Sequence, residues 1–214
     1  TAKLMSPEKK VLIPDMDAGC SLAASLTGED VRLLKKKYPG VPVVSYVNTS
    51  ADVKAETDVC CTSANAVKVV ESLKTDKVIF LPDQHLGRNT AVLSLGLELE
   101  DCVLWNPWKP MGGLTPDEIR AAKIILWRGH CSVHGRFTVE SVNEVRKQVP
   151  GIKVLVHPEC QHDVVSAADV VGSTEMIIKT VEQSPAGSAW AIGTELNLVS
   201  RLAKAHPDKQ IIFL

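Results

Sequence analysis

The sequence predicts an α/β protein in a pseudo-threefold arrangement of similar domains, each a four-stranded parallel sheet flanked by helices. Two observations support this fold class. Short apolar, β-branched runs alternate with amphipathic stretches along the chain, which is typical of parallel strands joined by crossover helices. The order of strands also occurs twice, from 41 to 127 and from 152 to 214, and internal repetition is a signal of fold.

In the first full repeat, strands are expected at 41–47, 58–61, 77–81 and 123–127. The helix before them ends at Tyr38-Pro39-Gly40, because proline and glycine terminate helices. Thr115-Pro116 begins a further helix, with threonine as the cap and proline at the first position. The segment 104–113 is rich in proline and glycine, and we expect it to be a loop.

The second repeat has strands expected at 152–156, 169–171, 190–192 and 210–214, with helices near 138–148, 164–168, 175–182 and 195–205. The opening run 11–20 is similar to the last strand and cysteine of an earlier unit. The expected domains are therefore 1–20 as the end of a largely missing first domain, 21–130 as the second, and 131–214 as the third, without its closing segment.

Composition excludes several classes of protein. A formal net charge of -1 gives no reason to expect a nucleic acid partner, and no apolar run of about 18 residues predicts a membrane span. The first residues lack a hydrophobic segment, so we expect no secretory signal. Six cysteines are spread widely and form no CxxC pair, so we expect a cytoplasmic protein whose thiols are core residues or metal ligands.

Residues that could do chemistry follow the predicted strands. Cys131 and His134 come after one strand, Tyr46 and Asn48 end another, and His157 with Glu159 follows a third. Open α/β sheets bind ligands at this edge, and His with Glu is the usual acid–base pair. Ser63, Ser173 and Thr174 precede helices, where hydroxyls can bind phosphate or carboxylate but are also ordinary caps.

Cys20 and Cys131 follow equivalent strands and are candidate metal ligands. The repeat predicts a third cysteine within about ten residues after Leu214. Three thiolates with an open position suit an iron–sulfur cluster that acts as a Lewis acid.

Five segments resemble quinolinate synthases, in the same order along almost the whole chain: DVCCTSANAV (58–67), FLPD (80–83), GHCSVH (129–134), VHPEC (156–160) and GTE (193–195). The resemblance implies three similar α/β domains around a [4Fe-4S] cluster held by three cysteines. It implies condensation of iminoaspartate with dihydroxyacetone phosphate to quinolinate, a precursor of NAD. It also implies supply of iminoaspartate by an aspartate oxidase, and a plastid location if the source is a plant.

The resemblance assigns roles to residues of this chain. Cys20 and Cys131 would be the cluster ligands, and Cys60, Cys61, Cys102 and Cys160 would not. Tyr46 and Asn48 would line the substrate cavity, while Ser63, Ser173 and Thr174 would hold carboxylate or phosphate oxygens. His134, His157 and Glu159 would take part in binding and proton transfer, with Glu159 as the base.

The chain departs from the family pattern in several places. It has no counterpart of the first-domain histidine, tyrosine and serine, it lacks the third cysteine, 105–122 resembles an insertion, and His85 stands where asparagine is expected. We therefore expect a piece of a longer protein that is inactive alone. Two alternatives remain open: a hydrolase with Cys131 as nucleophile beside a histidine and Glu159, and a non-catalytic module that binds a phosphorylated metabolite.

Overall fold

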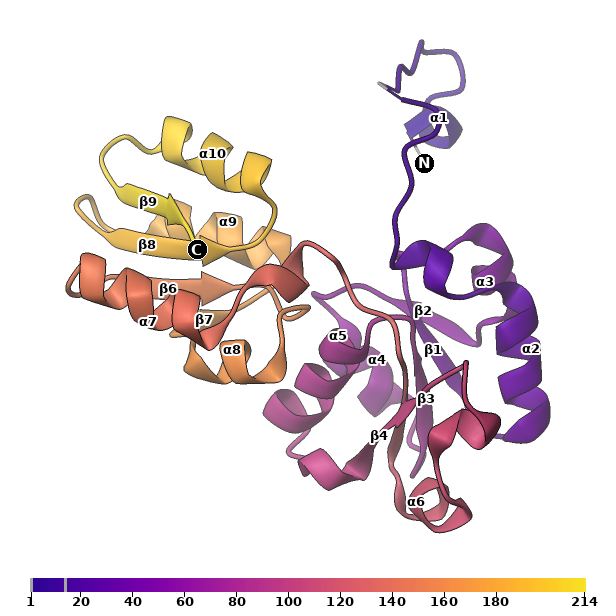
Figure 1. Cartoon of the computed structure of the whole chain (residues 1–214). Coiled ribbons are helices and arrows are strands. Elements are labelled where there is room, and N and C mark those ends of the chain that lie inside the picture. Colours follow the sequence, from indigo (N-terminus) through magenta and orange to yellow (C-terminus); the bar gives the residue numbers. More distant parts are fainter. Residues whose placement is uncertain (1, 14) are drawn as a thin grey trace.

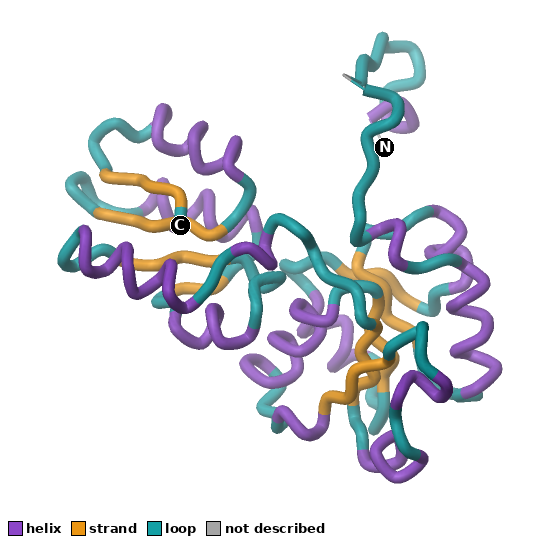
Figure 2. Tube along the Cα trace, viewed as in Figure 1, coloured by secondary structure: helices purple, strands orange, loops and turns teal. Residues whose placement is uncertain are grey.

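The computed structural model, described for residues 2–13 and 15–214, has two α/β lobes and an N-terminal arm (Figure 1). Each lobe is built on an all-parallel sheet. The arm, residues 2–20 apart from Pro14, is mostly loop and carries one short helix, α1 (Ala2–Met5) (Figure 2). The α/β class predicted from the alternating pattern is therefore confirmed.

The first lobe has the strand order β2-β1-β3-β5-β4. Its strands are β1 (Val43–Tyr46), β2 (Val59–Cys61), β3 (Val78–Leu81), β4 (Cys102–Trp105) and β5 (Ile124–Trp127). Its helices are α2 (Gly28–Lys37), α3 (Ala51–Glu56), α4 (Ala66–Ser72), α5 (Gln84–Asn89) and α6 (Pro116–Ala121), with shorter turns η1 (Ala23–Ser25), η2 (Thr90–Ser94), η3 (Leu99–Asp101) and η4 (Pro110–Gly113).

The second lobe has the strand order β7-β6-β8-β9. Its strands are β6 (Lys153–Val156), β7 (Val170–Val171), β8 (Ala189–Gly193) and β9 (Gln210–Phe213). Its helices are α7 (Val139–Gln148), α8 (His162–Ala167), α9 (Thr174–Gln183) and α10 (Leu196–Ala205), and the turn η5 (His134–Arg136) precedes them. None of the helices among the described residues is long and apolar enough to cross a membrane.

Helices cover both faces of each sheet. In the first lobe, Val44 and Phe80 pack with α4 and α5, whereas their neighbours Val43 and Ile79 pack with α2 and α3. Successive side chains of a strand point to opposite faces, so a strand that is apolar throughout needs cover on both sides. These four residues are almost completely buried, and each such burial is worth about 1.5–3 kcal/mol.

The internal repeat predicted from the sequence is present in the structure. Strands β1, β2, β3 and β5 occupy the same sheet positions as β6, β7, β8 and β9. Thr27 and Thr138 cap the first helix of each lobe, and Gly40 and Gly151 take positive φ after those helices. The members of each pair lie the same number of residues apart, so the two lobes share one plan.

An acidic residue fixes the same strand in both lobes. Asp58 accepts a hydrogen bond from the Val43 N–H at 2.8 Å, and Asp169 accepts one from the Val154 N–H at 2.7 Å. Each carboxylate also pairs with a basic side chain of the first helix of its lobe. Each of these acidic residues thus joins the start of β1 or β6 to the loop before the next strand and to the first helix of its lobe.

The prediction of a four-stranded sheet in the first lobe is wrong by one strand. Residues 104–113 were expected to be a loop, but β4 begins at Cys102 and pairs with β5 through Trp105. The apolar run that forms β4 is short, and the prolines that follow it favoured a loop prediction. Gly112, at φ +69, packs against the Trp105 ring, where a side chain would collide. Thus the segment 105–122 returns the chain from an edge strand to β5.

The predicted strand at the start of the chain is not formed. Residues 11–13 have no regular structure and are exposed, and Pro14 lies outside the described residues. A strand needs a neighbour that supplies its hydrogen bonds, and no described strand pairs with this segment. Among the described residues, the only helical structure between this segment and α2 is the short turn η1.

Candidate functional site

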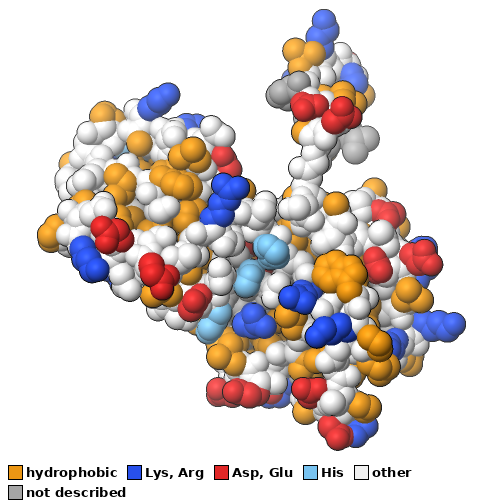
Figure 3. All heavy atoms as spheres, in the orientation of Figure 1, with side chains coloured by type: hydrophobic (Ala, Val, Ile, Leu, Met, Phe, Trp, Pro, Cys, Tyr) orange, Lys and Arg blue, Asp and Glu red, His pale blue; other side chains and the backbone are white. Residues whose placement is uncertain are grey.

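Four of the predicted residues meet where the two lobes join. Tyr46 ends β1, His134 lies in η5 after β5, and His157 and Glu159 follow β6. All four line one cavity of about 460 Å³. Their side chains are buried although they come from distant parts of the sequence. The space-filling view shows exposed histidine side chains along the crease between the lobes (Figure 3), whereas His134 and His157 of this cavity are buried.

Glu159 is the centre of this group. One carboxylate oxygen, Oε2, lies 3.1 Å from His157 Nδ1 and 3.4 Å from His134 Nδ1. The Tyr46 hydroxyl donates to the same oxygen at 3.4 Å. A buried carboxylate is costly unless it is paired and hydrogen-bonded, and the Tyr46 hydroxyl and the His157 ring offset part of that cost at this position.

The two histidine rings stack and are held at their outer edges. Their centroids lie 4.6 Å apart with planes 20° from parallel. His134 Nε2 lies 3.3 Å from Thr194 Oγ1, and His157 Nε2 lies 3.2 Å from Ser63 Oγ. Each hydroxyl fixes the orientation of its ring, so the Nδ1 atoms stay directed toward Glu159.

Burial sets the protonation states of two members. Burial, and then the neighbouring His157, lowers the pKa of His134 to about 4, although Glu159 acts in the opposite direction. Burial, followed by the charges of Glu159 and Asp83, raises the pKa of Tyr46 well above its ordinary value. At neutral pH His134 is therefore uncharged, and Tyr46 keeps the proton that it donates.

The His157 Nδ1 atom faces two partners, the carboxylate and the backbone N–H of Glu159. His157 Nδ1 lies 3.1 Å from Glu159 Oε2 but also accepts a hydrogen bond from the Glu159 backbone N–H at 3.3 Å. With a proton on Nδ1 the ring donates to the carboxylate, and without it the ring accepts from the backbone. This geometry suits a group that takes up and returns a proton.

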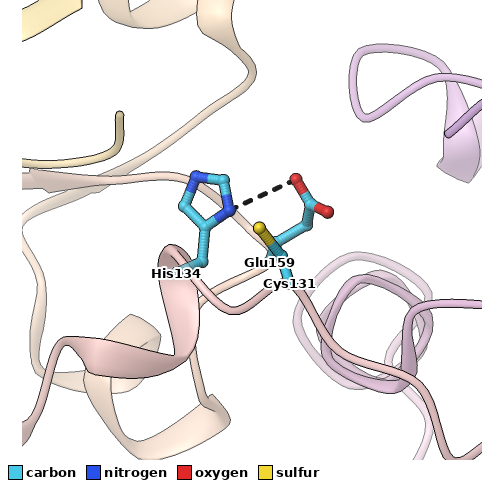
Figure 4. A group of neighbouring side chains, drawn as sticks. All are labelled: Cys131, His134 and Glu159. Atoms are coloured by element: carbon cyan, nitrogen blue, oxygen red, sulfur yellow. Dashed lines mark ion pairs between the residues drawn. The ribbon is translucent and has the colours of Figure 1, made fainter. Parts of the chain in front are cut away.

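The Cys131 thiol lies beside this group. Ligand atoms of Cys131, His134 and Glu159 lie within 4.8 Å of one another (Figure 4). Two buried atoms there, His134 Nδ1 and Glu159 Oε1, make no hydrogen bond. Native structures rarely leave buried polar atoms without partners. A thiol, an imidazole and a carboxylate with free lone pairs could bind a metal ion or a polar ligand.

Asp83 is a site residue that the functional assignment from sequence missed. It is fully buried and caps α5 by accepting from the Leu86 N–H at 2.7 Å, and it accepts from the Cys131 N–H at 3.1 Å. Burial and the charge of Glu159 raise its pKa above the ordinary value. Its place at the end of β3 was the available signal, because the neighbouring strands also end in polar residues.

Cys20 and Cys131 share one local geometry. The Cys20 carbonyl accepts from the Ala24 N–H at 2.9 Å, and the Cys131 carbonyl accepts from the Gly135 N–H at 3.0 Å. A short turn, η1 or η5, follows each cysteine. The surroundings of the two cysteines differ, however: Cys20 is exposed at the end of the arm, while Cys131 is half-buried beside Glu159.

The other cysteines lie in different surroundings. Cys61, Cys102 and Cys160 are buried, and Cys60 is exposed on β2. Burial raises the pKa of Cys61 to about 12 and that of Cys102 to about 11. Such thiols stay protonated at neutral pH when no metal is bound, and none of these four cysteines belongs to the group of Cys131, His134 and Glu159.

The predicted anion-binding residues divide between two hollows. Asn48 and Thr174 line the same cavity as Glu159. Ser63 and Ser173 line a separate groove of about 840 Å³ between the lobes, and Ser173 caps α9 by accepting from the Met176 N–H at 3.4 Å. The cavity also contains Arg201, a cation on α10 that sequence reasoning missed because it lies within a helical pattern.

A family model described as quinolinate synthetase A protein matches residues 1–214. A quinolinate synthase of Streptomyces coelicolor is 57% identical over 225 residues, which cover 99% of this chain and 57% of that protein. One from Nocardioides sp. is 53% identical over 229 residues, covering 99% and 58%. One from Bacillus subtilis is 46% identical over 225 residues, covering 97% and 59%.

The chain therefore spans a little over half the length of these curated relatives. The family model nevertheless matches it from end to end. The chain belongs to the quinolinate synthetase A protein family.

Proposed function

We propose that this chain supplies two of the three domains of a quinolinate synthase, which condenses iminoaspartate with dihydroxyacetone phosphate to give quinolinate. The observation that supports this best is the buried group of Glu159, His157, His134 and Tyr46 at the join of the lobes. A condensation followed by dehydration needs a group that removes and returns protons in a water-poor site.

Glu159 is proposed as the general base. Its Oε2 would take the proton from substrate carbon or nitrogen, and His157 Nδ1, at 3.1 Å, would share it. Tyr46 would donate a hydrogen bond to an oxygen of the bound substrate in place of Glu159. His134 would act as an uncharged hydrogen-bonding group, because burial lowers its pKa to about 4.

Both substrates are anionic, and the remaining residues are proposed to bind their charges. Thr174 and Ser173 lie at the N-terminal end of α9, a ten-residue helix whose free N–H groups favour phosphate or carboxylate. Asn48 and Ser63 would bind further oxygens. Arg201 adds a positive charge to the same cavity.

The family's [4Fe-4S] cluster is proposed to be held by Cys20, Cys131 and a third cysteine after Leu214. The chain's own residues fit two of these positions, because both cysteines share one loop geometry and Cys131 lies among buried atoms that lack partners. When bound, the cluster would supply a Lewis-acidic iron that polarises a substrate oxygen.

We also propose a cytoplasmic location, where free thiols stay reduced, and an aspartate oxidase as the source of iminoaspartate.

The hydrolase alternative is less well supported. Burial is the first of the effects that raise the pKa of Cys131, and a thiol without a lowered pKa is a poor nucleophile.

The test compares Cys131→Ser with Cys60→Ser in the full-length protein, reconstituted anaerobically with iron and sulfide. Cys131→Ser should lose the cluster's iron and its broad visible absorption, because a hydroxyl is a poor ligand for iron at neutral pH. Cys60→Ser should keep both, since Cys60 lies on an exposed strand position. Equal iron content in wild type and Cys131→Ser would refute the ligand assignment.

A further inference from the structure

Asn89 is a buried polar residue that the proposed reaction does not use. It is the last residue of α5, directly before the π-helical turn η2, and only 2% of its surface is exposed. Wide π turns inside helices occur frequently at functional sites. In Figure 1, α5 lies next to α8 of the other lobe, so this residue is placed where the lobes meet.

Every hydrogen bond of the Asn89 side chain goes to the second lobe. Its Nδ2 donates to the Pro158 carbonyl at 2.8 Å and to the Cys160 carbonyl at 2.9 Å. Its Oδ1 lies 2.9 Å from His162 Nδ1. Carbonyls can only accept, so the amide nitrogen must face them, and the oxygen then faces a protonated Nδ1. The amide is therefore fully bonded in a single orientation.

The two carbonyls that Asn89 binds are those on either side of Glu159. Within residues 2–13 and 15–214 they accept no other hydrogen bond from the protein. The Cys160 N–H turns back to the His157 carbonyl at 3.0 Å and closes the loop. The peptide groups thus face Asn89 while the Glu159 side chain faces the cavity.

We infer that Asn89 is a positioning residue that holds the 157–160 loop, and with it Glu159 and His157, at the join of the lobes. The inference deepens the proposed function and rests on the role given there to Glu159. Misplacing a reacting group by about 1 Å can reduce a rate by about 10²-fold. Because Asn89 fixes the backbone on both sides of Glu159, its loss could displace the carboxylate enough to lower the rate by that factor.

Asn89→Asp is the sharpest test, because the side chain keeps its shape but loses both donated hydrogen bonds. Asn143→Asp introduces the same charge at an exposed position on α7 and serves as the control. In the full-length protein, Asn89→Asp should lower kcat for quinolinate formation by about 10²-fold while KM changes much less. The control should match wild type.

Hydrogen exchange of the backbone amides gives a readout that does not depend on activity. In Asn89→Asp the amides of Glu159 and Cys160 should exchange at least tenfold faster, whereas amides of β6 and α7 should be unchanged. His162→Ala, which removes only the partner of Oδ1, should produce a smaller change in the same direction. This second variant keeps the test decisive if Asn89→Asp does not fold.

The possible outcomes distinguish the positioning role of Asn89 from the proposed role of Glu159 as the base. Unchanged exchange in the 157–160 loop would overturn the positioning role, and so would faster exchange with an unaltered kcat. If instead Glu159→Gln kept full activity while Asn89→Asp still loosened the loop, the proposed role of Glu159 would fail and the loop contact would stand. A fall in kcat together with faster loop exchange would support both.

Discussion

The buried, uncharged state of His134 predicts a measurable dependence of stability on pH. Its pKa is about 4 in the folded chain and about 6.5 when unfolded. The unfolded state therefore binds a proton at a higher pH than the folded state does. The stability that comes from keeping this ring neutral is present above about pH 6.5 and is lost as the pH falls toward about 4.

The size of the effect follows from the pKa difference. Between about pH 7.5 and 5.0, nearly all unfolded chains gain a proton at this ring, while few folded chains do, which costs about 2 kcal/mol. The groups that face the ring are His157, Glu159 and the Cys131 thiol, with Tyr46 beyond Glu159. Glu159 opposes the shift, and the pKa of about 4 already includes its effect.

The assay is urea unfolding of wild type and His134→Gln at both pH values. Glutamine cannot be protonated, so the variant should lose about 2 kcal/mol less than wild type between the two pH values, even if it is less stable throughout. His206→Gln, at the end of α10 outside the cavity, should keep the wild-type difference. Equal pH dependence in wild type and His134→Gln would refute the reasoning.

Two further predictions concern the base and the cysteine loop. Glu159→Gln in the full-length protein should reduce quinolinate formation by about 10²–10⁴-fold while substrate still binds, because an amide keeps the shape but cannot accept the proton. Steady-state kinetics measure this effect, and a variant that keeps most of its activity would leave Glu159 only a structural role. Gly129→Ala should destabilise the chain by about 1–3 kcal/mol in urea unfolding, because its Cβ would overlap the Pro82 carbonyl and the Ser25 hydroxyl. Gly135→Ala, whose nearest neighbour would be a His130 ring atom at 3.4 Å, should be tolerated, and equal stability of the two variants would contradict this packing argument.

Much of the fold could be predicted because local patterns and the final structure agree. The predicted strand 77–81 is apolar from Val78 onward, as expected of a strand covered on both faces, and residues 78–81 form the buried β3. The strand β4 could not be predicted with the same ease. Its four residues at 102–105 become a strand only because β5 offers a free edge, and a single segment does not encode that partner.

The residues of the candidate site also differ in how well the sequence predicted them. Glu159, His157, His134 and Tyr46 were found because parallel strands bring their carboxyl ends to one edge of a sheet. Asp83 and Asn89 were missed because their roles lie in contacts with other loops. Asp83 binds the Cys131 backbone and Asn89 binds the backbone around Glu159, and such tertiary contacts have no local sequence pattern.

The position of the two cysteines in the repeat has a consequence for how the protein assembles. Cys131 lies between the last strand of one lobe and the first helix of the next, and Cys20 precedes the first helix of the other lobe. Each cysteine therefore lies in a segment that leads into a lobe rather than in a strand or helix of a lobe. Whatever binds both thiols would also set the angle at these segments, so cofactor insertion and domain orientation would be a single event.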